Sequence, residues 1–365
     1  MSIATAIQNA QTKVANAYTA VSGKGWTLPA TQNLSNLPTA INSIPSWWGS
    51  FVWIPRDIVN DTMQHIAENH TYTLPAEVTN LGDYALYSGF YGDDKLTSVD
   101  MNNLTTIDWA YAMTSAFQWA TSLTSANFSN LNSITGTQAI GSTFQSCSNL
   151  TNVNFSNLET VINNNAMYYC FRACTSLTEL NFPKLKIIDG PLAFSGACHT
   201  CRALTTVSFP SMETITGSNV MNLAFQNCSS LTTIYFTKLK TIGINDSASN
   251  YSHLSGFLQG CPNVTTLTFP ELEAIYTNGG TNGSNGSFSN NPYLQKLYFP
   301  KLTIITYGDW TSSSNRAACK NTFYGCSALT ELHFAAANQA AIQATDGYST
   351  AWGRWAGNVT IYFDL

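Results

Sequence analysis

One phrase recurs along most of this chain of 365 residues, and for most of its length the distance between copies is fixed. The phrase, L-T-x-(V/A/L/I)-x-(F/M)-x-x-(L/M)-x-x-(I/V), begins every 27 residues at Leu96, Leu123, Leu150, Leu177, Leu204 and Leu231. It returns with looser spacing at Val264, Leu294 and Leu329, a degenerate copy begins near Leu74, and a last fragment runs from Val359 to Phe363. Self-similarity at such a period is typical of solenoids.

Within a unit, the first apolar residues alternate with polar ones, as Leu150, Val153 and Phe155 do. This alternation predicts a strand with one buried face. Proline follows the strand in several copies, where a chain must leave a ladder, and we expect a looser segment with a phenylalanine to pack behind. A single unit cannot bury its own apolar face, so equivalent side chains must stack between units. We therefore predict a solenoid with one parallel sheet over residues 72–365.

The composition disfavours several classes of function. Apolar residues make up 44 % of the chain, enough for a large core, whereas charged residues make up only 10 %, against about 25 % in an average soluble domain. A net charge of −5 without a Lys/Arg block disfavours a nucleic-acid partner. No apolar run is long enough for membrane insertion, and the first residues do not resemble a secretory signal.

Two segments show a resemblance to a known family. AFQNCSSLTTIYF from Ala224 and AFSGACHTCRALTTVSFP from Ala193 match the A-F-x-x-C-x-x-L-x-x-(V/I)-x-(F/L)-P signature. In this signature the chain resembles the BspA-like leucine-rich repeats over roughly residues 72–365. The resemblance implies that the fold is an α/β solenoid, the right-handed leucine-rich-repeat solenoid with one parallel sheet. It also implies a surface-displayed binding protein that is not an enzyme.

Most of the cysteines follow the repeat. Cys147, Cys174, Cys201, Cys228, Cys261 and Cys326 each precede the next unit by three residues. Cys198-His199-Thr200-Cys201 looks like a redox or zinc motif, but the repeat itself generates it. We therefore predict buried free thiols, no metal and no cofactor. Acidic residues are sparse and occupy different columns, so no catalytic pair is predicted.

Residues 1–45 do not belong to the repeats. Ile3, Ile7, Ala10, Val14, Ala17 and Val21 follow a heptad seam, which predicts a helix. The helix either folds back as a hairpin or oligomerises through Ile3, Ile7, Val14 and Val21, for example as a homotrimer. The segment, with its Lys24–Pro29 turn, is similar to short modules of phage tail and fibre proteins. That resemblance implies attachment to other virion proteins.

The segments at the two ends of the repeats are predicted to be caps. Residues 46–71 form an aromatic linker that contains Trp47, Trp48 and Trp53, and we expect it to cover the first rung. Tyr348, Trp352 and Trp355, together with the last strand, should close the other end.

Repeat columns also suggest where a ligand binds. The position between the second and third apolar residues should point to the open strand face, and there we predict ligand contacts at Asn154, Asn181, Tyr235, Tyr298 and His333. The same side chains would alternatively form cross-strand ladders. A second candidate surface lies in the variable loops, at Trp109, Tyr111, Trp119, Tyr168, Tyr169, Arg172 and Trp310.

These observations favour a non-enzymatic receptor-binding or adhesion protein of a phage tail, made in the bacterial cytoplasm and carried on the virion. Its partner would be a glycan or protein on the host surface. The alternative is a bacterial BspA-like cell-surface adhesin.

Overall fold

The computed structural model describes residues 69–76, 78–243, 253–276, 288–306, 323, 325–344 and 359–365. The chain divides into two units, Met1–Val52 and Trp53–Leu365, and the described residues all belong to the second. The predicted helical module with Ile3, Ile7, Val14 and Val21 lies outside the described residues. So do most of the predicted aromatic linker, the C-terminal cap residues Tyr348, Trp352 and Trp355, and Trp310.

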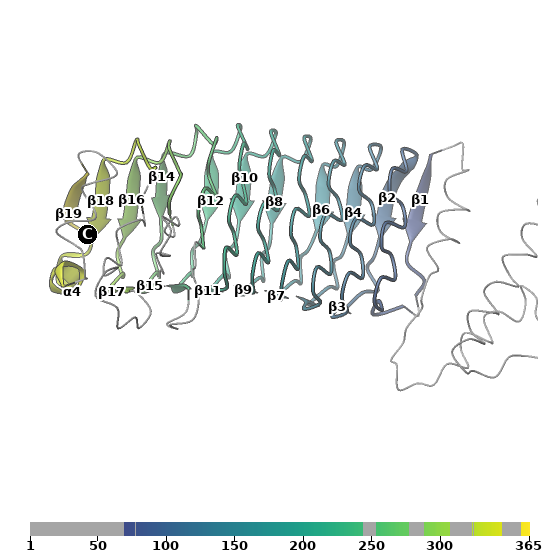
Figure 1. Ribbon diagram of the computed structural model, residues 1–365, viewed down its shortest axis with the longest axis horizontal. Helices are drawn as coiled ribbons and strands as arrows, with labels where there is room; N and C mark the ends of the chain where they lie inside the picture. Colours follow the sequence, from purple (N-terminus) through teal and green to yellow (C-terminus); the bar gives the residue numbers. More distant parts are fainter. Residues whose placement is uncertain are drawn as a thin grey trace, which may run out of the picture. The chain divides into compact units, whose positions relative to one another are not determined.

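The second unit is a solenoid whose rungs each contribute one strand to a front row (Figure 1). All neighbouring strands in this row that are hydrogen-bonded are parallel, in the sets β1-β2-β4-β6, β8-β10-β12 and β14-β16-β18-β19. The bounds are β1 His70–Thr73, β2 Leu96–Asp100, β4 Ser125–Asn127, β6 Asn152–Asn154, β8 Glu179–Asn181, β10 Thr206–Ser208, β12 Thr233–Tyr235, β14 Thr266–Thr268, β16 Lys296–Phe299, β18 Glu331–Phe334 and β19 Thr360–Phe363. The repeat starts at Leu96 to Leu329 thus correctly predicted the front strands.

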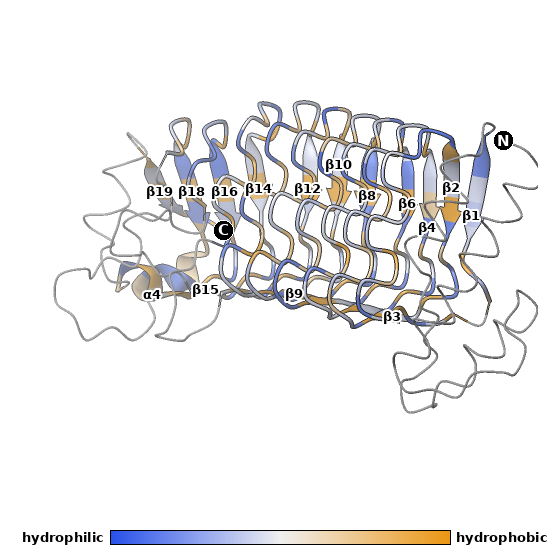
Figure 2. Cartoon of the chain, turned by 45° about the vertical axis from the view of Figure 1, so that its right-hand side comes forward, coloured by the Kyte–Doolittle hydropathy of each residue, from blue (hydrophilic) through white to orange (hydrophobic). Residues whose placement is uncertain are grey.

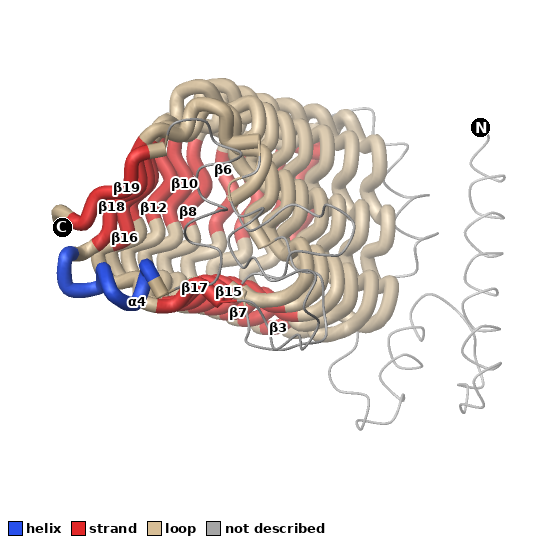
Figure 3. The backbone as a smooth tube through the Cα atoms, turned by 60° about the vertical axis from the view of Figure 1, so that its left-hand side comes forward, coloured by secondary structure: helices blue, strands red, loops and turns tan. Residues whose placement is uncertain are grey.

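The prediction of one parallel sheet is wrong, because eight of the rungs add a second strand on another side (Figure 3). These strands form one continuous eight-stranded parallel sheet, the second row. Their bounds are β3 Thr106–Ile107, β5 Ser133–Ile134, β7 Thr160–Ile162, β9 Ile187–Asp189, β11 Thr214–Ile215, β13 Thr241–Ile242, β15 Ala274–Tyr276 and β17 Ile304–Thr306. The cause is the last apolar column of the repeat. Its β-branched residues, such as Ile134 and Ile188, are buried and favour extended backbone.

The α part of the predicted α/β class is also wrong. Helix in the described ranges is confined to a 3₁₀ turn, η2 (Ala336–Asn338), and one short helix, α4 (Gln339–Gln343). In place of helices, each rung returns to the front row through a run of turns, which we call the turn face. In the rungs that are described without gaps it comprises residues 83–92, 110–119, 137–146, 164–173, 191–200 and 218–227.

The turn face has a four-residue period that excludes an α-helix. Tyr111, Ser115 and Trp119 all have positive φ, and the equivalent residues of neighbouring rungs do too. A left-handed residue at every fourth position interrupts a right-handed helix. The amides alternate instead between two partners. Met113 N donates to Ala139 O of the next rung (2.7 Å), whereas Ala116 N donates to Met113 O of its own turn (3.0 Å).

Stacked phenylalanines form the core between these faces. The residue that follows the outward position of each front strand is almost always phenylalanine, and its ring lies on the ring of the next rung. Phe182 and Phe209 stack at 5.4 Å with 4° between planes, and Phe209 and Phe236 at 5.3 Å with 7°. This phenylalanine ladder runs through Phe128, Phe155, Phe182, Phe209, Phe236, Phe269, Phe299, Phe334 and Phe363. Figure 2 shows how hydrophobic (orange) and hydrophilic (blue) residues alternate along the rungs.

The cysteine column is confirmed as a set of buried free thiols. Eight cysteines are described, and all are free and buried. Each thiol of the column donates to a carbonyl of the preceding rung, as Cys147 Sγ does to Phe117 O and Cys174 Sγ to Phe144 O, both at 3.0 Å. Cys201 takes part in the same way, with Phe171 O, so the Cys-His-Thr-Cys segment is part of the repeat. Burial raises the pKa of Cys147 to about 12, which keeps this thiol protonated at neutral pH.

One buried histidine joins three rungs. The ring of His253 lies between Gly217 O, at 2.9 Å from Nδ1, and Tyr276 O, at 3.1 Å from Nε2. Gly243 makes this possible, because a Cβ there would lie 2.2 Å from Tyr276 O and 2.7 Å from His253 Nε2. Desolvation lowers the pKa of His253 to about 4, so the ring is neutral at physiological pH.

We expect Phe209→Ala to lower the free energy of unfolding by about 3–5 kcal/mol, since it leaves a cavity between two stacked rings. Denaturant unfolding followed by circular dichroism measures this. The control is Ser208→Ala, a neighbouring outward position, which should change stability by less than about 0.5 kcal/mol. Equal effects of the two substitutions would contradict a core held by the ladder.

We expect stability to decline as the pH falls from about 6.5 to about 4, because the unfolded chain binds a proton at His253 in this window and the folded chain does not. The depressed pKa corresponds to about 3 kcal/mol. His253→Gln should flatten this part of the curve of unfolding midpoint against pH. His199→Gln, at a part-exposed position on the turn face, should flatten it less. An unchanged slope in His253→Gln would rule out this assignment.

Candidate functional site

Outward side chains of the front row form one column in which every rung contributes one residue. Strand pairing places Asp100, Asn127 and Asn154 in register, then Asn181, Ser208 and Tyr235, then Thr268, Tyr298, His333 and Tyr362. The column contains the five predicted open-face residues and one that the sequence analysis missed, Tyr362. Its signal was present in Val359–Phe363, where Ile361 and Phe363 repeat the inward positions of a front strand.

The N-terminal end of this column is an asparagine ladder. Asn127 Nδ2 donates to Asp100 Oδ1 (3.0 Å), and Asn154 Nδ2 donates to Asn127 Oδ1 (3.2 Å). Each acceptor also receives a backbone amide, as Asn127 Oδ1 does from Ser129 N (3.2 Å). These contacts give Asn154 a structural role that joins rungs, and a ligand contact there stays a prediction. Asn181 is exposed and begins the next set of strands.

The C-terminal end of the column is aromatic. Tyr298 stacks on His333 with centroids 4.4 Å apart and 15° between the ring planes. His333 stacks on Tyr362 at 4.6 Å and 10°. The histidine is buried between the two tyrosines, while 38 % of Tyr362 is exposed. We call Tyr298, His333 and Tyr362 the aromatic ladder.

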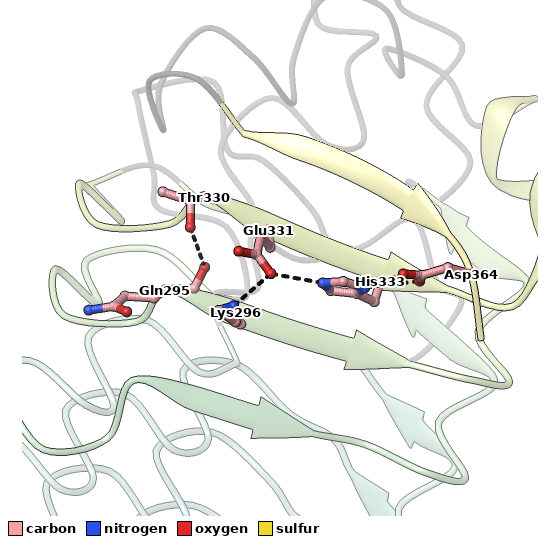
Figure 4. Close-up of polar contacts among 6 residues, drawn as sticks. All are labelled: Gln295, Lys296, Thr330, Glu331, His333 and Asp364. Carbon is pink, nitrogen blue, oxygen red and sulfur yellow. Dashed lines mark hydrogen bonds and ion pairs between the residues drawn. The ribbon is translucent and has the colours of Figure 1, made fainter.

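Charged side chains hold the central ring of the aromatic ladder (Figure 4). Glu331 Oε2 lies 3.1 Å from His333 Nε2 and 2.9 Å from Lys296 Nζ. On the other side of the ring, Asp364 Oδ1 lies 2.9 Å from His333 Nδ1. The hydrogen bond between Lys296 and Glu331 lowers the pKa of Glu331 and raises the pKa of Lys296. Both side chains are therefore charged at neutral pH. The ring orientation is thus fixed before any ligand arrives.

Tyr235 stands apart from the aromatic ladder. It is 49 % exposed, and the next residue of the column, Thr268, separates it from Tyr298. Thr266 and Thr268, the two outward residues of β14, are both exposed and small. The outward side chain of the column is therefore smaller at β14 than at β12 or β16.

Trp310 lies outside the described residues. The other alternative residues lie on the turn face or, in the case of Trp109, directly before it, on a different side of each rung and in two clusters. Near the first rungs, Tyr111 stacks on Tyr84 (5.0 Å, 10°), and Trp109 and Trp119 are 36 % and 49 % exposed. In the middle rungs, Tyr168 contacts Tyr169 at 4.1 Å, and the Arg172 guanidinium lies 5.0 Å above the Tyr169 ring. The sequence analysis missed Tyr84 and Tyr91, which are about half exposed, because they belong to the degenerate first copy.

Neither surface has the groups of a metal site. Across the described ranges, no cluster of three or more His, Cys, Asp or Glu side chains is suited to a metal ion. In the same ranges, no helix has the length and apolar character of a bilayer span. The arrangement offers stacking area and hydrogen-bonding groups on a rigid sheet.

A repeat solenoid with a rigid, decorated strand face defines the class of this protein as a binding scaffold. A family model described as "BspA type Leucine rich repeat region" matches residues 56–184 and 143–278. These matches cover more than half of the chain, which therefore belongs to the BspA-type leucine-rich repeat family. No enzyme family is indicated.

Several solved structures are similar to the chain. One is a leucine-rich cell surface protein of Faecalibacterium prausnitzii, with 17 % identity over 73 % of this chain and 88 % of that one, and a TM-score of 0.28. A leucine-rich repeat protein of Bacteroides ovatus has 16 % identity over 80 % and 92 %, with a TM-score of 0.25. One of Eubacterium ventriosum has 16 % identity over 73 % and 72 %, with a TM-score of 0.21. No curated protein sequence matches the chain.

We expect Asn127→Ala to lower the free energy of unfolding by about 1–3 kcal/mol, because Asp100 and Asn154 then each lose a partner inside the asparagine ladder. Asn181→Ala at the equivalent position should cost less than about 0.5 kcal/mol. Denaturant unfolding of both variants measures the difference. A comparable loss in Asn181→Ala would show that the ladder is not the cause.

Proposed function

We propose that this chain is a non-enzymatic adhesion protein of the bacterial cell surface, which binds a glycan or protein exposed on another surface through the C-terminal half of its front row. The observation that carries this proposal is the aromatic ladder. The outward column is small and polar as far as Ser208, and then it presents Tyr235, Tyr298, His333 and Tyr362.

The physical argument rests on preorganisation. Tyrosine and histidine offer contact area and hydrogen bonds at little cost in side-chain entropy. Here the rings are already stacked, and Glu331 and Asp364 contact both nitrogens of the central ring. A ligand therefore loses little affinity to the ordering of these side chains. Solvent-exposed rings are not needed for the core, which the phenylalanine ladder fills.

The surface setting follows from family membership. The family match ends at residue 278 and includes Tyr235 and Thr268, and the rungs of the aromatic ladder continue the same solenoid beyond it. For repeats of the BspA type, display on a cell surface is the expected setting. This supports the alternative drawn from the sequence over the main reading, a phage-tail protein.

The phage-tail role remains a second candidate because of one observation. Residues 1–45 are similar to short modules of phage tail and fibre proteins. In that case this segment attaches the chain to other virion proteins, as a homotrimer through Ile3, Ile7, Val14 and Val21, and the repeats face the host. Mass spectrometry of purified virions and surface proteolysis of intact cells separate the two settings, since the chain will be found in one sample and not in the other.

Binding of the full chain to arrays of glycans and of extracellular matrix proteins tests the proposed face. We expect Tyr298→Ala combined with Tyr362→Ala to weaken the strongest interaction at least about tenfold, as loss of central aromatic contacts does. The control combines Tyr111→Ala with Trp119→Ala on the turn face and should bind as the wild type does. If only the control loses binding, the turn face is the binding surface and our assignment is wrong.

A further inference from the structure

In the outward column of the front row, the small, exposed Thr268 of β14 lies between Tyr235 on one side and Tyr298 on the other. We call this position the slot, with Thr268 as its floor and the two tyrosines as its walls. We propose that this slot binds one uncharged pyranose ring of a glycan, held between the two tyrosine rings. This inference rests on the proposed binding function and assigns it a ligand class.

The three residues lie on successive rungs in one column. Thr268 and Tyr298 are direct partners in the β14–β16 pairing. Strands β12 and β14 are not hydrogen-bonded, but the rungs that carry them are neighbours. The rings of Phe236 and Phe269, which directly follow Tyr235 and Thr268, stack at 5.7 Å with 20° between planes, and Ile242 pairs with Ile275 in the second row.

Each of the two tyrosines has a ring face that no other described aromatic ring covers. One face of Tyr298 is covered by His333, and its parallel stacking at 4.4 Å turns the opposite face along the row toward the rung of Thr268. Among the described residues, His333 is the single ring that contacts Tyr298, and no ring contacts Tyr235. Tyr235 is 49 % exposed and has small neighbours in its column on both sides, Ser208 and Thr268.

The spacing fits a sugar better than a flat ring. Hydrogen-bonded strands such as β14 and β16 lie about 4.8 Å apart. Across the division between β12 and β14, the Phe236 and Phe269 rings are 5.7 Å apart, so walls two rungs apart are separated by roughly 10 Å. Carbon atoms in contact lie ~3.5–4.0 Å apart, so a planar ring between the walls would span only about 7–8 Å. A puckered chair adds the thickness that a flat ring lacks. In a β-glucopyranoside every axial substituent of the ring is hydrogen, so C–H groups can meet both tyrosine faces.

The polar groups around the slot match an uncharged ligand. Thr266 and Thr268 are exposed and bring hydroxyl groups to the floor. Lys296, the strand-pairing partner of Thr266, is bound to Glu331 at 2.9 Å. The slot thus offers hydroxyl groups and ring faces with its neighbouring charges already paired, which suits the hydroxyls and C–H faces of a neutral hexose.

Saturation-transfer difference NMR of the full chain tests the slot. The probes are methyl β-D-glucopyranoside, methyl β-D-galactopyranoside and methyl α-D-mannopyranoside. We expect at least one of them to receive saturation at its ring C–H protons. Tyr235→Ala and Tyr298→Ala should each raise its Kd by roughly 2- to 10-fold, as loss of one ring contact does. Thr268→Trp should fill the slot and abolish the transfer.

Two control variants test whether the effects are specific to the slot. Tyr293→Ala removes a tyrosine that is 43 % exposed but lies outside the slot, and it should leave the Kd unchanged. Thr268→Ser keeps the floor open and should retain binding. Circular dichroism and unfolding midpoints confirm that each variant is folded, and a misfolded Thr268→Trp is replaced in the comparison by the Tyr235→Ala, Tyr298→Ala double variant.

The proposal is overturned if none of the glycosides receives saturation from the wild type, or if transfer persists in the folded blocking variant. The outcome is separable from that of the adhesion function. A blocking variant that loses the glycosides but still binds the array ligand limits the slot to a subsite and leaves the adhesion function standing. Glycoside binding without any array ligand supports the slot and contradicts adhesion.

Discussion

Contact between equivalent rings on successive rungs is the interaction on which this structure depends. A single 27-residue unit has one buried phenylalanine after its front strand and nothing within the unit to cover its two faces. Laying Phe182 on Phe209 and Phe209 on Phe236 buries both faces of each ring and fixes the rung spacing at the same time. The backbone follows this spacing, since every other amide of the turn face donates to the next rung.

The sequence was informative wherever one residue type occupies one column. The period located the front strands, and the alignment of Cys147 with Cys174 and Cys201 correctly predicted free buried thiols in place of a redox motif. It was less informative where the local pattern fits two structures. The four-residue spacing of Ala166, Cys170 and Cys174 is close to a helical one, and only the positive φ of Tyr169 and Ala173 distinguishes turns from a helix. Two-residue strands such as Ser133–Ile134 leave almost no alternation to detect.

The sequence also predicted one aspect of the candidate site and missed another. The outward column was predictable as a column, because its position relative to the apolar residues never changes. Its division into an asparagine ladder and an aromatic ladder was not, because it depends on side-chain contacts between residues about 27 to 31 positions apart, such as Asn154 with Asn127 and His333 with Asp364. The partners of His333 come from its own strand and from the last residues of the chain, so no local pattern connects them.

The two strand rows differ in continuity, and this gives the solenoid a mechanical asymmetry. The second row is one unbroken eight-stranded sheet, whereas the front row is divided between β6 and β8 and between β12 and β14. Bending at these two divisions would break no strand pairing within the described front row, because β6 is not paired with β8, nor β12 with β14. Tyr235 and Thr268 lie on opposite sides of the second division, so tension along the molecule acts directly on the distance between them.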